Sequence, residues 1–400
     1  MPGYTTGHFA FLEWQNQDMI INSAFQPIAD LFFAQQEKYP LGGSSLAIFK
    51  DGEPVLNIWQ GEAEVGKPWT QDTTSVVFSC TKALTSIMAH RLVQEGKLDL
   101  DQKVSFYWPE FAQEGKQDIP VKWLLQHKAG LSTTRRDLTM DQITDGHTLE
   151  EELAAQEPLW EPGTAHGYHA LTFGTLVGKL IHNITGLTAG KYFAELIAKP
   201  LGVDAWIGLP KDKFANLAPL ISDGNRPEVI AEPNTDLYWQ SKAMSFGGAL
   251  NHLVESYETG FNNPKLIAAE LPAAGAVSNA FSLAKIFSAA ATETSGIRLL
   301  EDETLRAAVV PQSTGPLKFE SKDAPAYPAW GNGFMVDVPG LKDLLGPSSF
   351  GHDGLGGQNA FGDFEHRVGF AYTSNYLLSG ADDQWRQQVL IRALKGILAA

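Results

Sequence analysis

Strand patterns lie at both ends of this chain, and a long helical section separates them. Residues 44–49 and 54–59 are rich in β-forming side chains and flank Asp51-Gly52, a pair typical of a β-hairpin turn. From about 82 to 294 the apolar spacing is mainly helical. Further strand patterns occur only in the last quarter, at 333–337, 348–351, 358–361 and 367–373. We therefore expect one sheet assembled from both ends of the chain, with the helical section inserted.

Helical patterns accompany these strands. Residues 22–39 form an amphipathic pattern that stops before Pro40, and 383–398 form another at the end of the chain. Patterns in the middle of the chain are a capping-box sequence at 148–151 and helical spacing at 171–183 and 189–198. These elements predict an α+β fold, an α/β sandwich whose antiparallel sheet is flanked by helices.

The same patterns predict how the chain divides. Residues 1–78 and 300–400 are expected to form a discontinuous sheet domain, and residues 79–299 a mainly helical domain. Because clefts usually form where such parts meet, we expect the functional site at their boundary.

Charge and cysteine content exclude several classes of protein. A net charge of −16 disfavours nucleic acid or an anionic membrane as a partner, because few Lys and Arg are available to displace counterions. The single cysteine, Cys80, excludes an internal disulfide and any Cys-rich zinc site. The first residues lack a basic and apolar leader pattern, and no apolar stretch has the ~18 residues of a membrane span. Cytoplasmic residence is expected, and a homo-oligomer stays open.

The sequence Ser79-Cys80-Thr81-Lys82 stands where an extended apolar run turns into a helical pattern. A serine three residues before a lysine at a helix start places both side chains on one face. A serine hydroxyl needs an adjacent base to become a nucleophile, and a desolvated lysine of lowered pKa can serve. Backbone N–H groups at the helix start can also stabilise an oxyanion. Ser79 and Lys82 are therefore candidate catalytic residues.

The same motif recurs at Ser282-Leu283-Ala284-Lys285. There it follows Ser278-Asn279, which has the character of an N-cap, so Ser282 and Lys285 are expected on the polar face of an ordinary surface helix. Cys80 points about 100° away from Ser79 around the helix and is expected to be a small buried filler.

Two further segments extend the pattern around Ser79. Tyr168 lies on a loop ahead of a helical pattern, and Gly351-His352-Asp353-Gly354-Leu355 lies beside a C-terminal strand. Together with Ser79 and Lys82, these segments resemble the serine β-lactamase and penicillin-binding-protein superfamily, with its signatures Ser-x-x-Lys, Tyr-x-Asn and Lys-Thr-Gly. Within it the chain is most similar to the family VIII carboxylesterases, relatives of the class C β-lactamases. The resemblance covers roughly residues 20–395.

The resemblance implies a β-lactamase/transpeptidase-like fold and a role for each matching residue. Ser79 would be the nucleophile that is acylated, and Lys82 and Tyr168 would share the proton transfers. Which of the two is the base stays open at this point. The backbone N–H groups of Ser79 and Leu355 would form the oxyanion hole.

The chain departs from the superfamily at two positions that hold a β-lactam. Ala170 stands where the second signature has Asn, and His352 stands where the third has Lys. His352, Gly354 and His169 are candidates for the substrate pocket. His352 could equally be a hydrogen-bonded strand residue, and the glycines could serve a tight turn. Histidines 166 and 169 could suggest a metal pair, but without a third ligand they are expected to be surface loop histidines.

These observations predict a serine carboxylesterase that hydrolyses small or short-chain esters through an acyl-enzyme on Ser79, with no cofactor and no metal. The alternatives are a β-lactamase, an amidase or an acyltransferase with the same site, and a scaffold protein without turnover. No serine lies in Gly-x-Ser-x-Gly, which disfavours an α/β-hydrolase.

Overall fold

The computed structural model describes residues 18–222, 224, 228–250, 253–320, 327–378 and 382–399, without the side chains of 382–385. Within these residues a seven-stranded antiparallel sheet has the order β1-β3-β2-β11-β10-β9, with β4 paired to β3. Its strands are β1 (Ile20–Ile21), β2 (Gly43–Lys50), β3 (Glu53–Glu64), β4 (Lys67–Pro68), β9 (Ser349–Gly354), β10 (Gln358–Asp363) and β11 (Val368–Ser374). The pairing of β2 with β11 joins the two ends of the chain, as predicted.

The β2–β3 hairpin shows why this sheet could be recognised from sequence. Asp51 and Gly52 have φ angles of 55° and 84°, which suit the tight turn that an Asp-Gly pair favours. Register pairs run from Lys50 with Glu53 to Gly43 with Gly61.

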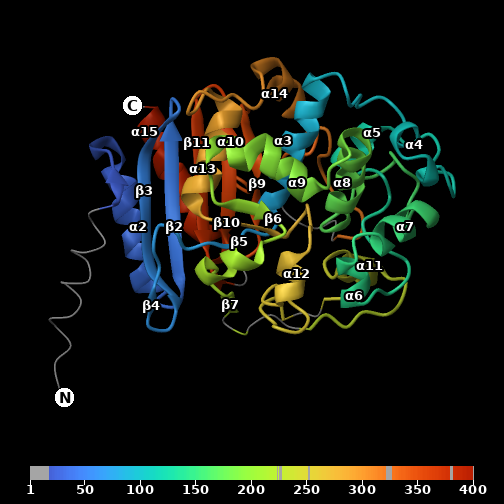
Figure 1. The fold of residues 1–400 in the computed structure, drawn as a ribbon, viewed down its shortest axis with the longest axis horizontal. Coiled ribbons are helices and arrows are strands. Elements are labelled where there is room, and N and C mark those ends of the chain that lie inside the picture. Colours follow the sequence, from blue (N-terminus) through green and yellow to red (C-terminus); the bar gives the residue numbers. More distant parts are fainter. Residues whose placement is uncertain are drawn as a thin grey trace.

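Helices cover both faces of the sheet (Figure 1). On one face, α2 (Gln26–Lys38) and α15 (Asp382–Leu398) bury Phe32 and Leu390 against Ile48 and Phe370. On the other face, α13 (Ala280–Ala291) packs on β2, β10 and β11. This arrangement is the predicted α/β sandwich, although α13 lies in the section that the predicted division assigns to the helical domain.

The helical section lies beside the sheet, at the right of Figure 1. Its core includes α3 and α8, which pack against each other, and α3 also contacts β9. Two small sheets accompany it, the three-stranded β5-β8-β6 and the two-stranded β12-β7. The elements outside the main sheet are η1 (Ser23–Phe25), β5 (Ser75–Val76), α3 (Cys80–Gln94), α4 (Val104–Tyr107), η2 (Pro109–Phe111), α5 (Val121–Leu125), α6 (Met140–Thr144), α7 (Thr148–Ala155), α8 (Thr172–Thr185), α9 (Ala189–Phe193), η3 (Ala194–Ala198), α10 (Lys199–Leu201), β6 (Ala205–Ile207), η4 (Lys211–Asn216), β7 (Ile221–Ser222), α11 (Asp236–Ala243), α12 (Pro264–Ala268), β8 (Ala276–Ser278), α14 (Asp302–Ala308) and β12 (Tyr376–Leu377).

Two local predictions were wrong. Residues 333–337 form no regular strand, and Met335 makes only isolated bridges, to Trp330 and to Gly351. The capping box predicted at 148–151 is absent, because the Asp145 carboxylate accepts hydrogen bonds from the N–H groups of His147 and Thr148 instead.

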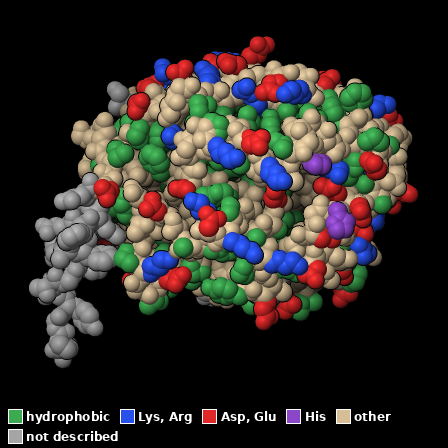
Figure 2. Space-filling model, viewed as in Figure 1, with side chains coloured by type: hydrophobic (Ala, Val, Ile, Leu, Met, Phe, Trp, Pro, Cys, Tyr) green, Lys and Arg blue, Asp and Glu red, His purple; other side chains and the backbone are tan. Residues whose placement is uncertain are grey.

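The surface carries acidic and basic side chains side by side on the face shown in Figure 2. Such mixing gives no continuous basic patch on that face, consistent with the acidic composition. No helix within the described residues is both long and apolar enough to cross a membrane.

Candidate active site

The start of α3 is fixed in place by its neighbours. Ser79 is the N-cap residue of this helix, and Phe78 before it has a φ of 46°, a conformation that bulky side chains rarely adopt. Thr81 Oγ1 donates a hydrogen bond to the carbonyl of Phe78 and accepts one, of 3.0 Å, from the N–H of Ala276 in β8. These contacts hold the turn that presents Ser79.

The structure brings the three predicted catalytic side chains together. Lys82 Nζ lies 3.0 Å from Ser79 Oγ, and Tyr168 Oη lies 2.9 Å from the same oxygen. Lys82 Nζ also donates to the carbonyls of Ala170 and Ala273, the latter at 3.0 Å. The hydroxyl of Ser79 therefore contacts both candidate proton carriers.

Burial sets different protonation states for the two partners of Ser79. Burial lowers the pKa of Lys82 to about 7, although the carboxylate of Asp353 opposes the shift. Burial raises the pKa of Tyr168 far above its usual range. A neutral amine has two N–H donors, which the carbonyls of Ala170 and Ala273 can accept. Its lone pair then remains for the hydroxyl proton of Ser79.

Two aromatic rings lie nearly parallel to the ring of Tyr168. The centroid of Trp330 is 5.5 Å away at an interplanar angle of 20°, and that of His352 is 5.9 Å away at 24°. Trp330 Nε1 donates to His352 Nε2 at 3.4 Å, and His352 Nδ1 donates to the carbonyl of Asp353 at 2.7 Å. Both nitrogens of His352 thus have protein partners, and its side chain is only 1% exposed.

The carboxylate beside this cluster is neutralised within the protein. Asp353 pairs with Lys342, and both side chains are largely buried. Burial opposes ionisation of Asp353, but the charge of Lys342 and the contact with His352 hold the pKa of this carboxyl below its usual range. Asp353 therefore stays charged near the amine of Lys82.

The backbone groups predicted to form the oxyanion hole lie at one cavity. A Cβ on Gly354 would sit 2.4 Å from the carbonyl oxygen of Val77, so only glycine allows β9 to approach the segment before Ser79 this closely. Ser79, two residues after Val77, and Leu355, directly after Gly354, both line the cavity. Within the part of the chain that the structure describes, neither N–H donates to a protein acceptor.

The three residues predicted for the substrate pocket do not line the cavity at Ser79. His169, His352 and Gly354 are not among the residues that line the cavity, whereas Tyr168 and Leu355 are. His169 is fully buried, accepts from the N–H of Leu131 at Nε2 and donates from Nδ1 to the carbonyl of Gly167. Burial lowers the pKa of His169 to about 4, which keeps the ring neutral.

The prediction of surface histidines was wrong, because His166 and His169 are 7% and 0% exposed. No group of three or more His, Cys, Asp or Glu side chains within the described ranges is arranged to hold a metal ion.

Sequence reasoning missed two residues beside Tyr168. Trp330 stacks on it, and His127, which is buried with a φ of 58°, has its ring 5.3 Å from that of Tyr168. His127 Nδ1 accepts from the N–H of His169 at 3.3 Å. His127 lies in residues 124–131, a stretch similar to one that family VIII carboxylesterases carry at a comparable position, and this similarity could have marked it. No sequence pattern marks Trp330.

The second Ser-x-x-Lys motif has structural contacts. Ser282 Oγ accepts a hydrogen bond from the N–H of Asp204, and Lys285 Nζ donates to the carbonyl of Leu201. Asn279 caps α13 as predicted, but Ser282 is only 3% exposed, so its expected position on a surface was wrong. Cys80 is buried, as expected, and burial raises the pKa of its thiol.

A family model described as Beta-lactamase matches residues 28–393 of the chain. The esterase/beta-lactamase LipL of Mycobacterium tuberculosis is 34% identical over 357 residues, which cover 84% of this chain and 78% of that protein.

Solved structures agree with this match. A family VIII carboxylesterase has a TM-score of 0.82 at 29% identity, covering 94% of this chain and 98% of that chain. A penicillin-binding protein homologue from Caulobacter crescentus has a TM-score of 0.80 at 29% identity, covering 95% of this chain and all of that chain, 100%. With the family model matching far more than half of the sequence, the chain belongs to the Beta-lactamase family.

Proposed function

We propose that the chain is a serine carboxylesterase that forms an acyl-enzyme on Ser79. The observation that carries the proposal is the contact of Ser79 Oγ with both Lys82 Nζ and Tyr168 Oη at the wall of a cavity. The names of LipL and of the family VIII carboxylesterase, both similar to this chain over most of its length, support ester hydrolysis.

The two proton carriers have different roles in this reaction. Neutral Lys82 takes the proton of Ser79 as its oxygen attacks the ester carbonyl. The backbone N–H groups of Ser79 and Leu355 stabilise the oxyanion. Tyr168, which is protonated at the start, donates a hydrogen bond to Ser79 Oγ and gives its proton to the oxygen of the departing alcohol. Lys82, protonated in the first step, then returns a proton to Tyr168. Water then releases the acyl group by the same steps in reverse.

The protonation states give a pH prediction. Because the base must be neutral and burial lowers the pKa of Lys82 to about 7, kcat/KM should rise as pH increases through about 7. Below that value it should fall about tenfold per pH unit, as one proton is bound. A pH profile with p-nitrophenyl acetate, corrected for spontaneous hydrolysis, measures this limb. A profile that is flat from pH 5.5 to 8 would contradict Lys82 as the base.

The residues that replace the β-lactam contacts favour esters. Ala170 has no amide side chain, and its carbonyl is used by Lys82. His352 is buried, and its ring nitrogens are used by Trp330 and Asp353. Neither position therefore offers a group for the amide or the carboxylate of a β-lactam, whereas a neutral ester needs neither.

The substrate class can be tested directly. We expect kcat/KM for p-nitrophenyl butyrate to exceed that for a chromogenic cephalosporin by at least about 100-fold, the effect of losing one or two charge-assisted contacts of ~1.5–3 kcal/mol each. Both substrates are measured with the same enzyme preparation and active-site titration. Equal or faster cephalosporin turnover would favour a β-lactamase instead.

The division into domains, the cellular location and the oligomeric state also remain proposals. We infer that residues 1–78 with 300–400 and residues 79–299 act as two domains with the site at their boundary, although α13 of the second range packs on the sheet of the first. The single buried Cys80 supports cytoplasmic residence. A homo-oligomer is to be tested by light scattering.

A further inference from the structure

The cavity at Ser79 continues far beyond the reacting atoms. Its volume is about 1310 Å³, and one wall is formed by α11. Most of the helix lines it: Leu237, Tyr238, the residues from Gln240 to Ala243, and Met244 at the C-cap. α11 and residues 228–231, which precede it, thus line the same cavity as the nucleophile Ser79.

Much of this wall is apolar and accessible. Leu237 and Met244 are 48% and 52% exposed, and Ile230 is 86% exposed, yet all three line the cavity. Large apolar side chains gathered around one concave surface mark a binding site more often than single exposed ones do. Deeper in the cavity the lining is also apolar and includes buried side chains of Leu250 and Phe261.

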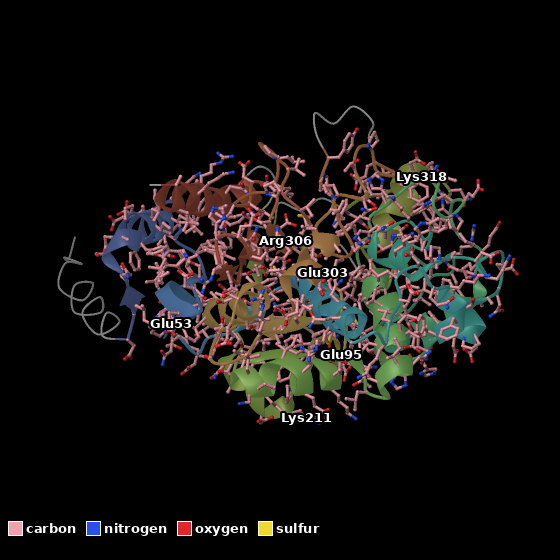
Figure 3. All side chains as sticks on the ribbon, turned by 90° about the horizontal axis from the view of Figure 1, so that it is seen from above. Glu53, Glu95, Lys211, Glu303, Arg306 and Lys318 are labelled. Atoms are coloured by element: carbon pink, nitrogen blue, oxygen red, sulfur yellow. The ribbon has the colours of Figure 1, made fainter. Side chains whose placement is uncertain are left out.

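Charged side chains also line the cavity, but they leave the apolar surface of the wall accessible. Lys242 Nζ bonds to Asp137 Oδ1 at 2.8 Å and to the carbonyl of Arg135 at 2.9 Å, so its charge is already compensated. Lys318 also lines the cavity and is exposed. In Figure 3 this residue lies at one edge of the molecule, opposite the edge that carries Lys211. Glu320 lines the wall near Gln240, and burial raises the pKa of its carboxyl.

The size of the cavity exceeds what a short ester needs. Pockets that hold drug-sized ligands have volumes of about 300–1,000 Å³. An acetyl or butyryl ester bound at Ser79 would fill only a small part of a cavity of about 1310 Å³. Water at such a wall is released when an apolar group takes its place.

We propose that the α11 wall, defined here by Ile230, Leu237 and Met244, is a subsite for a bulky apolar group of the ester substrate. The inference rests on the proposed function, since it places that group on a substrate that acylates Ser79. It departs from the short-chain preference expected from the sequence. The group belongs to either the acyl or the alcohol part of the ester, and two series of substrates separate these.

The first test varies one side of the ester at a time. The acyl series compares p-nitrophenyl hexanoate with p-nitrophenyl acetate, and the alcohol series compares 2-naphthyl acetate with phenyl acetate, whose leaving groups are similar. Each methylene buried in an apolar site contributes a factor of about four. We expect kcat/KM to rise at least about tenfold in one series, which identifies the side. A flat or falling kcat/KM in both series overturns the proposal.

A matched pair of variants locates the effect. Leu237→Ser should lower the ratio of kcat/KM for the larger ester to that for the smaller by at least about threefold. Val65→Ser also replaces an exposed apolar side chain, but Val65 is fully exposed in the turn between β3 and β4 and does not line the cavity. It should keep the wild-type ratio. Equal ratios in the two variants would overturn the assignment to α11.

Binding without turnover separates this proposal from the proposed function. The variant Ser79→Ala cannot be acylated at that position, so p-nitrophenyl hexanoate and acetate can be compared by equilibrium binding. If the turnover series places the group on the acyl side, we expect the hexanoate to bind at least about tenfold more tightly than the acetate; if it places the group on the alcohol side, 2-naphthyl acetate should bind at least about tenfold more tightly than phenyl acetate. Leu237→Ser in that background should reduce the difference. If the wild-type protein is inactive but Ser79→Ala binds the larger ester more tightly, the subsite is supported and the esterase is refuted. If the wild-type protein is active but Ser79→Ala binds both esters equally, the esterase is supported and the subsite is refuted.

Discussion

Ser79→Ala is expected to lower kcat/KM for p-nitrophenyl acetate by at least about 10⁴-fold, because removal of a nucleophile leaves only binding and oxyanion contributions. The change deletes one oxygen whose partners are Lys82 and Tyr168. The fold should persist, since the side chain of Ser79 caps no helix N–H. Steady-state kinetics and thermal unfolding of the same preparation measure both effects.

The chain contains its own control for this variant. Ser282 stands in the second Ser-x-x-Lys motif, also near a helix start, but its hydroxyl accepts from the N–H of Asp204. Ser282→Ala should lower stability by roughly 1 kcal/mol through that lost bond and leave kcat/KM within about twofold of wild type. If the two serine variants lost activity equally, the assignment of the nucleophile would be wrong.

Lys82→Met and Tyr168→Phe should each lower kcat by about 10²–10⁴-fold, the usual contribution of a positioned acid or base. The double variant should be little worse than the more damaged single variant, because both side chains act on the same oxygen of Ser79. Single-turnover and steady-state rates of all three variants give the comparison. Losses that multiply would show two independent functions.

Stability must be measured with these variants. Lys82→Met keeps the length of the side chain but leaves the carbonyls of Ala170 and Ala273 without their donor, at a cost of about 1–3 kcal/mol for each unpaired group. Lys285→Met is the matched change in the second motif, where the amine donates to the carbonyl of Leu201. It should share a loss of stability without the loss of kcat.

The sheet could be predicted because its signals are local. The Asp51-Gly52 turn and the runs of β-forming residues on both sides of it indicate a hairpin. Where a partner distant in sequence decides, prediction failed: residues 333–337 meet Gly351 only at an isolated bridge through Met335. The cap of α7 failed for another reason, because Asp145, three residues before Thr148, competes for the same donors.

The active site likewise contains residues that could be predicted from the sequence and residues that could not. Ser79 and Lys82 share one helix, so their contact follows from spacing, and Tyr168 was found through resemblance to a family. The surroundings of Tyr168 could not be predicted, because Trp330 and His352 meet it through tertiary packing. Burial likewise decides that His352 has its nitrogens occupied and that the pKa of Lys82 falls to about 7.

The most direct test of the account is covalent labelling of the wild-type protein with a fluorophosphonate, followed by intact mass and peptide mapping. The geometry predicts one adduct per chain, on Ser79, because its hydroxyl alone among the two Ser-x-x-Lys motifs contacts both a lysine amine and a tyrosine hydroxyl. Labelling should disappear in Ser79→Ala and persist in Ser282→Ala. An adduct on Ser282, or no adduct in a folded protein, would contradict the account.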